Sequence, residues 1–287
     1  MIPYNDLIKL NQPYVPVRGK ADLDRVIAAL QQDPASREFV RRYSVPEDSQ
    51  RRRQWVQATL TARLPGDFSA ELLASTDCLL QQELVSKNIT DASDLSGLNV
   101  KHLDSEKISI WNGDISTLKI GAITNAANAQ MLGCFQPFHA CIDNVIQCAA
   151  GPQLREDCHQ IMQHQGHDEA TGDAKITRAY NLPADFVLHT VGPIVTDHCP
   201  SAQQVKQLAS CYRACLALAA EARVRSIAFC GISTGVFGYP PEKAASVALS
   251  TVIEWLRDHP NTMDHIVFNT YGAQATTIYT TTVEDYV

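Results

Sequence analysis

The amino-acid sequence predicts a layered α/β fold, because short β-rich runs alternate with amphipathic helical runs over most of its length. The alternation starts near Lys101, and the part before that residue shows helical patterns only. With 45% apolar and 19% charged residues among 287, the chain has enough apolar side chains for a sizeable core. We therefore expect a helical N-terminal extension over residues 1–103 and an α/β domain over residues 104–287.

Apolar residues in the N-terminal part recur at helical spacing over Asp22–Gln32, Gln50–Leu64 and Ser69–Val85. The second of these helices should end at Pro65-Gly66, a pair that stops helices. Its run Arg51–Arg53 is either a nucleic-acid patch or a solvated helix face. We expect the solvated face, because charge runs on helices are common.

The remaining part should contain strands that alternate with helices. The strands are expected at Ile108–Trp111, Ala122–Thr124, Phe186–Val191, Ser226–Cys230 and His265–Phe268. The helices are expected at Asp143–Ala150, Gln203–Ala222 and Glu242–Asp258. Such an alternation gives a sheet that is covered on both faces and binds ligands at the carboxyl ends of its strands.

Charge and cysteine usage narrow the class of protein. The net charge of −7 argues against a nucleic-acid interface but allows an anionic small ligand, which backbone N–H groups can bind. No apolar stretch is long enough to span a membrane, and the start of the chain lacks a secretory pattern. The nine cysteines, largely in apolar segments, are typical of reduced thiols. We expect a cytoplasmic monomer with no nucleic-acid or membrane partner.

Two thiols and an imidazole lie close together at Cys134, His139 and Cys141. Thiolate and imidazole are good zinc ligands, and three protein ligands leave a fourth position for water or substrate. The alternative is three loop residues without a special role. The density of these residue types favours a zinc site.

Other thiols and imidazoles form weaker candidate metal sets. These sets are Cys158-His159 with His164 and His167, and His198-Cys199. Exposed polar histidines are the simpler interpretation of both. Cys211 and Cys215, four residues apart on an alanine- and leucine-rich helix, are expected to be core thiols.

Asp143 follows the predicted zinc ligands and precedes an apolar helical stripe. It is either the N-cap of that helix, a position that aspartate favours, or a carboxylate that orients or deprotonates water beside the metal. The pattern by itself leaves both interpretations open.

Glycine-containing turns complete the set of motifs. Gly231–Gly238 lies between a strand and the helix start at Pro240-Pro241, where successive N–H groups can approach an anion. Phe237 and Tyr239 could flank a sugar or a base, and Thr171–Thr177 is a second such turn. Together the motifs indicate a phosphorylated ligand that is processed beside a metal.

These motifs together resemble the macrodomain, an ADP-ribose-recognising three-layer α/β/α fold with a mixed central sheet, and within it the zinc-containing class of protein-ADP-ribose hydrolases. The family's motifs recur in order at Gly113–Ile115, Asn125–Asn128, Cys134–Asn144, Ala149–Gly151, Thr171–Ala174 and Ser233–Pro240. The helical N-terminal part, with Leu79–Leu84, resembles the extension of that class. The chain departs from the family at Gln147, commonly histidine, and at Val236, commonly isoleucine.

The resemblance implies a role for each matched position. Zn²⁺ would be held by Cys134, His139 and Cys141, while Asp143 and Asn128 would face the distal ribose. Asp114 and Ile115 would bind the adenine. The phosphates and the distal ribose would be held by Thr171, Gly172, Asp173, Ser233, Thr234, Gly235, Val236, Phe237, Gly238 and Tyr239.

The activity implied is zinc-dependent removal of mono-ADP-ribose from modified protein side chains, by hydrolysis at C1″ of the distal ribose. The partners would be ADP-ribose and the mono-ADP-ribosylated protein. The alternatives are a reader that binds ADP-ribose without cleaving it and a deacetylase of O-acetyl-ADP-ribose. Asp143 favours the enzyme, because a reader does not need a carboxylate beside the metal.

Overall fold

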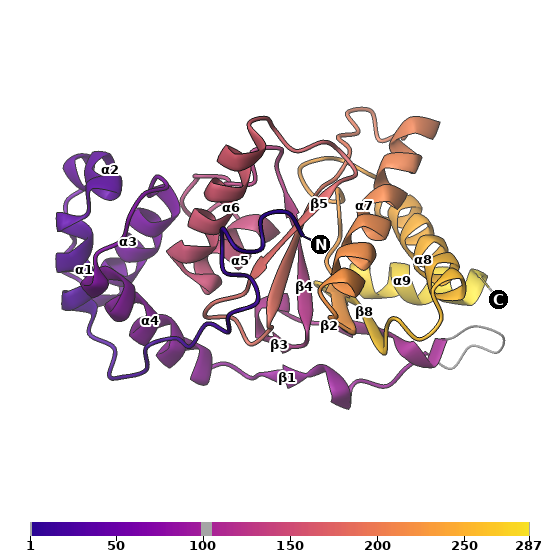
Figure 1. The fold of residues 1–287 in the computed structure, drawn as a ribbon, viewed down its shortest axis with the longest axis horizontal. Helices are drawn as coiled ribbons and strands as arrows, with labels where there is room; N and C mark the ends of the chain where they lie inside the picture. The colour runs from indigo at the N-terminus through magenta and orange to yellow at the C-terminus, as the bar shows by residue number, and fades with distance from the viewer. Residues whose placement is uncertain (1, 99–104, 287) are drawn as a thin grey trace.

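The computed structural model describes residues 2–98 and 105–286 and confirms the layered α/β architecture (Figure 1). A six-stranded sheet lies at its centre, in the order β2-β8-β7-β4-β6-β5. Its strands are β2 (Ile108–Asn112), β4 (Ala122–Ala127), β5 (Ala174–Arg178), β6 (Phe186–Val191), β7 (Ser226–Phe229) and β8 (His265–Thr270). All neighbours are parallel except β5, which pairs antiparallel with β6 at the sheet edge. The sheet is therefore mixed, as the family resemblance implies.

Helices cover both faces of this sheet. Figure 1 shows α5 (Ile142–Ala150) and α6 (Pro152–Gln165) on one side, and α7 (Ala202–Glu221), α8 (Pro241–Asp258) and α9 (Ala273–Asp285) on the other. Because both faces are covered, the central strands bury successive residues rather than alternate ones, as Ile123, Val187 and Ile227 illustrate with their buried neighbours. Within the described ranges, no helix is long and apolar enough to cross a membrane.

The N-terminal helices gather at one end of the molecule, beside α5 and α6 (Figure 1). They are α1 (Leu23–Gln32), α2 (Arg37–Arg42), α3 (Ser49–Ala62) and α4 (Ala70–Val85). Their apolar faces form a cluster of their own around Leu30, Trp55 and Leu72. Asp22 and Ser69 cap α1 and α4 with their side chains, so the local sequence determines where these helices begin.

The arginines of α3 form ion pairs within the extension. Arg52 pairs with Asp24 of α1, and Arg53 pairs with Glu83 of α4. Arg51 is exposed, as expected of a solvated face, whereas Arg52 and Arg53 are half-buried in these ion pairs.

The predicted division of the chain after residue 103 lies outside the described residues. The first residues, however, pack against the α/β part: Tyr4, Ile8 and Leu10 are buried in its core. The backbone N–H of Ile176 in β5 donates to the Tyr4 hydroxyl at 2.8 Å. The chain therefore starts on the α/β part, leaves it for α1–α4, and then returns to it.

Several elements are not expected from the sequence. Helix α6 carries few apolar residues, and its buried side chains include Arg155 and Asp157, so its helical period is weak. Helix α9 is rich in threonine, which has a low helix propensity. Strand β5 falls in a stretch that the sequence predicts as a turn, because it follows Gly172 closely. The remaining short elements are β1 (Thr90–Asp91), β3 (Leu118–Lys119) and the 3₁₀ turns Pro34–Ser36, Ala92–Asp94, Ser105–Lys107 and Ile115–Thr117.

A buried carboxylate joins the extension to the α/β part. Asp77 of α4 is fully buried and accepts hydrogen bonds from the Tyr14 hydroxyl and the Val17 backbone N–H. It also accepts from the side-chain amides of Gln153 in α6 at 3.0 Å and Asn181 at 2.8 Å. Since the donors come from separate segments, this one side chain ties them together.

Replacing Asp77 should therefore destabilise the whole protein. Asp77→Ala leaves several buried donors without an acceptor, and we expect the free energy of unfolding to fall by roughly 3 kcal/mol. Urea unfolding followed by circular dichroism measures the change. Glu254→Ala is the control, because Glu254 is exposed and pairs with Arg213 at the surface, so its loss should hardly change the urea midpoint. Equal midpoints for the two variants would contradict the proposed tie.

Candidate active site

The parallel strands place their following loops at one edge of the sheet. The polar segment that begins at Asn128 follows β4, and the loop Gly231–Gly238 follows the neighbouring strand β7. After β4 the chain continues to β5 and β6 on one side, whereas β7 and β8 lie on the other side. Such a change of direction opens a crevice between two neighbouring loops, which is where α/β sheets bind ligands.

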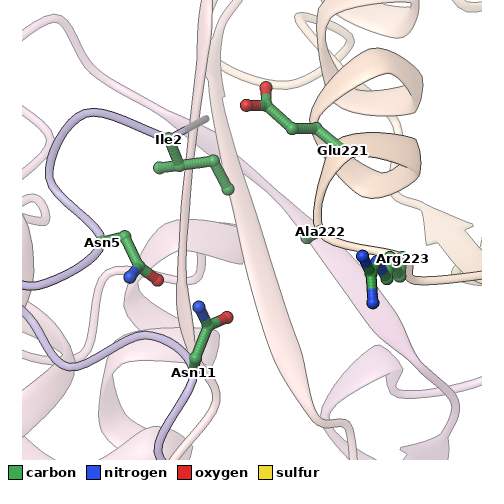
Figure 2. Close-up of a pocket in the computed structure, with 6 residues that line it drawn as sticks. All are labelled: Ile2, Asn5, Asn11, Glu221, Ala222 and Arg223. Carbon is green, nitrogen blue, oxygen red and sulfur yellow. The ribbon is translucent and has the colours of Figure 1, made fainter.

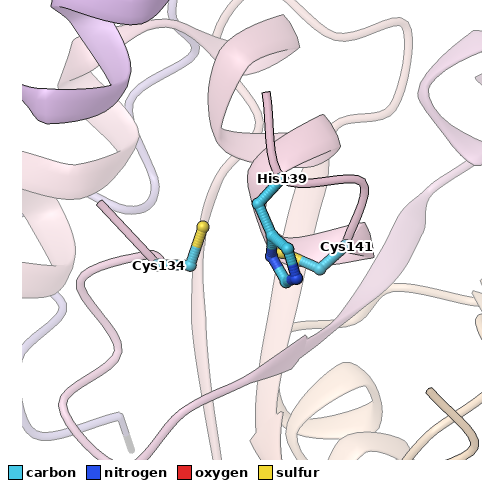
Figure 3. A group of neighbouring side chains, drawn as sticks. All are labelled: Cys134, His139 and Cys141. Atoms are coloured by element: carbon cyan, nitrogen blue, oxygen red, sulfur yellow. The ribbon is translucent and has the colours of Figure 1, made fainter. Parts of the chain in front are cut away.

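The predicted metal ligands come together at this edge (Figure 3). The Sγ atoms of Cys134 and Cys141 and a ring nitrogen of His139 all lie within 4.8 Å of one another. Within the described ranges, this is the group of thiol, imidazole and carboxylate side chains that has the spacing of a metal site. His139 Nδ1 is buried and has no hydrogen-bond partner in the described part of the chain. Two thiols and an imidazole nitrogen without a partner suit Zn²⁺.

The loop that carries these ligands is held in shape by its own hydrogen bonds. The Asn144 amide donates to the carbonyl oxygens of Gln136 at 3.2 Å and His139 at 3.0 Å. Phe135 and Phe138 adopt left-handed backbone conformations, which non-glycine residues rarely do. Burial, reinforced by the neighbouring Cys134 thiol, raises the pKa of Cys141 to about 11. A bound divalent cation would remove this penalty by favouring the thiolate.

Asp143 lies beside the cluster but does not cap helix α5. The N-cap position is Cys141, and no side chain caps the helix there. The N-cap interpretation of Asp143 is therefore wrong, because its carboxylate turns toward the sheet and is only 4% exposed. Burial raises the pKa of this carboxyl, while the amide of Asn125 and the charge of Arg155 oppose the shift.

Asn125 holds the Asp143 carboxylate from inside β4. Its Nδ2 donates to Asp143 Oδ1 at 2.8 Å and to His189 Nδ1 at 3.2 Å. Because His189 Nδ1 accepts this bond, its ring proton is assigned to Nε2, which donates to Thr177 Oγ1 at 2.9 Å. Burial lowers the pKa of His189 to about 3, so the ring is neutral near pH 7.

Asn128 follows β4 and turns the chain into the metal loop. Its Nδ2 donates to the carbonyl oxygen of Gly133 at 2.9 Å, and its Oδ1 is buried without a partner among the described residues. The same is true of Asn125 Oδ1. Buried polar atoms normally have partners, so these two oxygens mark a place where a ligand or water completes the hydrogen bonding.

The loop after β7 has the properties of an anion site. The consecutive backbone N–H groups from Ser233 to Phe237 donate to no acceptor within the described ranges. Ser233 is buried with a left-handed backbone (φ 64°), and its hydroxyl has no partner there. Val195 N–H and the His198 ring donate to the carbonyl oxygens of Phe237 and Gly238, which holds the loop from outside. Free N–H groups on a glycine-containing turn form a cradle for phosphate.

Other residues of this loop differ in exposure. Val236 is 79% exposed, whereas Tyr239 is buried and its hydroxyl has no partner in the described part of the chain. Thr234 Oγ1 donates to the carbonyl oxygen of Gly231, which leaves its own N–H available. Gly235 is open, since a side chain there would meet no neighbouring atom.

The turn Thr171–Asp173 lies beside the end of β6, but its donors are in use. The N–H of Gly172 donates to Val191 O at 2.9 Å, and the N–H of Asp173 donates to Ala170 O. Because the N–H groups of Gly172 and Asp173 are both used within the chain, the phosphate-binding role of this turn stays a prediction.

The predicted adenine-binding residues lie after β2. Asp114 caps the short turn Ile115–Thr117 by accepting from the N–H of Ser116 at 2.9 Å. Its other oxygen lies 3.7 Å from Lys87 Nζ, and Ile115 is buried. The carboxylate is thus oriented, and its role toward adenine stays a prediction.

The competing metal sets are not assembled within the described ranges. Cys158 is buried near His189, and His159, His164 and His167 do not join it in a cluster. The His198 ring is used by the Gly238 carbonyl. Cys211 and Cys215 are buried, as predicted, and all nine cysteines are free thiols.

Three residues of the site carry no recognisable sequence signal for their roles. Asn125 belongs to the recognised Asn-Ala-Ala-Asn run, but the resemblance assigns a role only to Asn128. His189 sits in an ordinary strand, and Arg155 sits in a helix with a weak period. Their contacts come from segments distant in sequence, so no local spacing reports them.

A separate hollow lies at the opposite edge of the sheet. Its volume is about 420 Å³, and Figure 2 shows Asn5 and Asn11 of the N-terminal segment facing the end of α7 at Glu221–Arg223 across it. That end of α7 leads into the start of β7, so the hollow is remote from the metal cluster.

A metal-type cluster, a buried carboxylate and an anion cradle at one sheet edge define a ligand-processing α/β/α domain. Comparisons identify the family. The Macro domain model matches residues 124–248. A protein-ADP-ribose hydrolase from Treponema medium is 45% identical over 235 residues, which cover 82% of this chain and 88% of that protein. The chain belongs to the macrodomain family, among relatives named protein-ADP-ribose hydrolases.

Solved structures agree with this assignment. The Oceanobacillus iheyensis macrodomain with ADP has 34% sequence identity and a TM-score of 0.56, covering 62% of this chain and 90% of its own. The Trypanosoma brucei macrodomain in complex with ADP-ribose has 26% identity and a TM-score of 0.61, covering 94% of this chain and 99% of its own. The family and fold predicted from the motifs are therefore confirmed.

The neutral state of His189 should make stability depend on pH. The unfolded chain binds a proton at His189 below about pH 6.5, whereas the folded chain does so only near pH 3. The free energy of unfolding should therefore fall on acidification through this window, by up to about 1.4 kcal/mol per pH unit from this group. The difference between wild type and His189→Gln, measured by urea unfolding at several pH values, isolates this contribution.

His164→Gln is the control for this measurement, because His164 is exposed. Its pH profile should follow that of the wild type. If the His189→Gln profile also runs parallel to the wild-type profile between pH 6.5 and 4, the ring is not buried in its neutral form.

Proposed function

We propose that this protein removes mono-ADP-ribose from modified protein side chains by hydrolysis at C1″ of the distal ribose, with zinc at Cys134, His139 and Cys141. Family membership makes the chain a hydrolase that acts on ADP-ribose linkages. The observation that carries the finer proposal is the position of Asp143. This buried carboxylate adjoins the metal-type cluster and is fixed by Asn125.

The residues present fit zinc in type and arrangement. The two thiols and the imidazole lie within 4.8 Å of one another, and His139 Nδ1 lacks a partner within the described ranges. Zinc bound there would supply Lewis-acid stabilisation of charge beside the scissile bond. The identity of the metal and its participation in the reaction are part of the proposal.

The ligand would be held by groups that are otherwise unused. The N–H groups of Ser233 to Phe237 would bind the diphosphate, which needs no lysine or arginine. Asp114 would accept a hydrogen bond from the adenine amino group, and Phe237 and Tyr239 would wall the distal ribose. The unpartnered oxygen of Asn128 would accept from a ribose hydroxyl. These contacts would bring C1″ next to Asp143.

Asp143 would act on the attacking water. Burial raises its pKa, which makes the carboxylate a stronger base than an exposed aspartate. Asn125 fixes one carboxylate oxygen and leaves the other for the water. As the water oxygen bonds to C1″, the bond from C1″ to the acceptor side chain breaks, and the proton passes by way of Asp143 to the leaving group. The products are ADP-ribose and the unmodified side chain.

Removing the carboxylate separates an enzyme from a reader. Asp143→Ala should abolish turnover and leave the Kd for ADP-ribose within about tenfold, or ~1.4 kcal/mol, of wild type. Release of ADP-ribose from a mono-ADP-ribosylated protein measures the first quantity, and calorimetric titration with ADP-ribose measures the second. Equal losses of turnover and of affinity for ADP-ribose would mean that Asp143 shapes the binding pocket.

Asp157→Asn serves as the control for this variant. Asp157 of α6 is also a buried carboxylate, and its pKa is raised to about 6, but its partners are Tyr180 and Arg178 rather than Asn125. Its turnover should match that of the wild type. If wild type binds ADP-ribose but releases none from protein or from O-acetyl-ADP-ribose, the chain is a reader.

The zinc content of the protein should depend on the side chains of the cluster. Cys141→Ala should purify with less zinc and hydrolyse more slowly, because a zinc site of three protein ligands loses one of them. Elemental analysis and turnover are measured on both proteins before and after chelation and zinc return. Cys199→Ala, which removes an exposed thiol outside the cluster, should keep its zinc content and its turnover. Unchanged zinc and activity in Cys141→Ala would refute the ligand assignment.

A further inference from the structure

Arg155 of helix α6 is a buried arginine for which the proposed reaction has no use. The residue is 7% exposed, and in the described part of the chain its hydrogen bonds go to backbone carbonyls rather than to a carboxylate. A buried guanidinium without an ion-pair partner is costly, so its contacts should explain why it is there. Those contacts reach in two directions.

In one direction Arg155 binds the N-terminal extension. Its Nη1 donates to the carbonyl oxygens of Leu60 at 3.0 Å and Arg63 at 2.7 Å. Both carbonyls lie at the C-terminal end of α3, where a helix has unpaired acceptors and negative dipole charge. The next residue, Glu156, accepts from the N–H of Gly66 at 2.8 Å. The extension therefore seats the guanidinium.

In the other direction Arg155 supports the metal loop. Its guanidinium stacks on the Phe135 ring at 4.5 Å, one residue after Cys134. Gly133 leaves the space that Arg155 occupies, since a side chain there would lie 3.1 Å from Nη2, and its positive φ disfavours other residues. Asn128 holds the carbonyl of that same glycine. The start of the loop is thus clamped between Arg155 and Asn128.

We infer that Arg155 is a positioning residue through which the N-terminal extension fixes the metal loop and the catalytic edge. The inference rests on the proposed function for its effect on turnover, whereas its effect on the loop can be measured without turnover. The N-terminal extension thereby gains a role in the site, because α3 orders the metal loop in addition to covering the α/β part.

Three substitutions test the clamp. Arg155→Gln removes the charge, and Arg155→Lys keeps it but loses the planar stack on Phe135 and one of the two carbonyl bonds. Phe135→Leu removes the stack from the loop side and leaves Arg155 seated on α3, so it remains informative if the arginine variants fold poorly. The measurements are hydrogen exchange of residues 133–141, the rate of zinc release to a chelator, kcat, and the Kd for ADP-ribose.

We expect all three variants to exchange faster at residues 133–141 and to release zinc about tenfold faster. The kcat should fall by about tenfold in Arg155→Lys and further in Arg155→Gln, while the Kd for ADP-ribose stays within about threefold. A purely structural arginine would lower stability and leave the zinc-release rate and the ratio of kcat to Kd unchanged.

Arg53→Gln is the matched control. Arg53 lies partly buried in α3, the helix that binds Arg155, but it pairs with Glu83 of α4, and no hydrogen bond joins it to the metal loop in the described part of the chain. Its loop exchange, zinc release and kcat should equal those of wild type. The inference is overturned if the Arg155 and Phe135 variants behave like Arg53→Gln.

Failure of the proposed function would look different. Wild type that holds zinc but shows no turnover would refute the hydrolysis proposal, and faster loop exchange and zinc release in Arg155→Lys would still support the clamp. Normal turnover in wild type together with unchanged loop exchange in the Arg155 variants would refute the clamp alone.

Discussion

The hydrogen bond from Asn125 to Asp143 is the interaction on which the site depends. It joins the middle of the buried sheet to the first turn of α5, so the carboxylate cannot move without the sheet. The same amide needs a neutral ring as its second acceptor, and the burial of His189 supplies one. A fully buried amide with both donors in use is rigid, and rigidity is what a catalytic carboxylate requires.

Around this hydrogen bond, different kinds of group would bind the phosphates, the metal and the carboxylate. Phosphate would meet backbone N–H groups in the loop after β7, an arrangement that requires no lysine and agrees with a net charge of −7. The metal-type cluster supplies thiols and an imidazole, and Arg155 is a buried positive charge that α3 holds against Phe135 of the metal loop. Asp143 and Arg155 are buried, whereas the metal-type cluster is half-buried and the loop after β7 is partly exposed, so a ligand can reach the last two from solvent.

The N-terminal extension is part of this arrangement in spite of its separate apolar cluster. Asp77 ties α4 to α6, and the C-terminal carbonyls of α3 bind Arg155. Tyr4, Ile8 and Leu10, which precede α1, are buried in the core of the α/β part. Removal of the extension would thus uncover α6 and also free the residues that approach the metal loop. The two parts of the chain form one structural unit around α6.

The sequence by itself determined the family, most of the strands and helices of the α/β part, and the metal-type residues, because these are properties of local spacing and of short motifs. Cys134, His139 and Cys141 lie in one loop, and the loop after β7 carries its own glycines. Only the tertiary structure decided that Asp143 does not cap a helix, because local sequence preference allowed both a helix cap and a carboxylate beside the metal. It also brought Asn125, His189 and Arg155 to the site, together with the weakly periodic helices α6 and α9. These depend on contacts between segments far apart in the chain, and such contacts leave no periodic trace in the sequence.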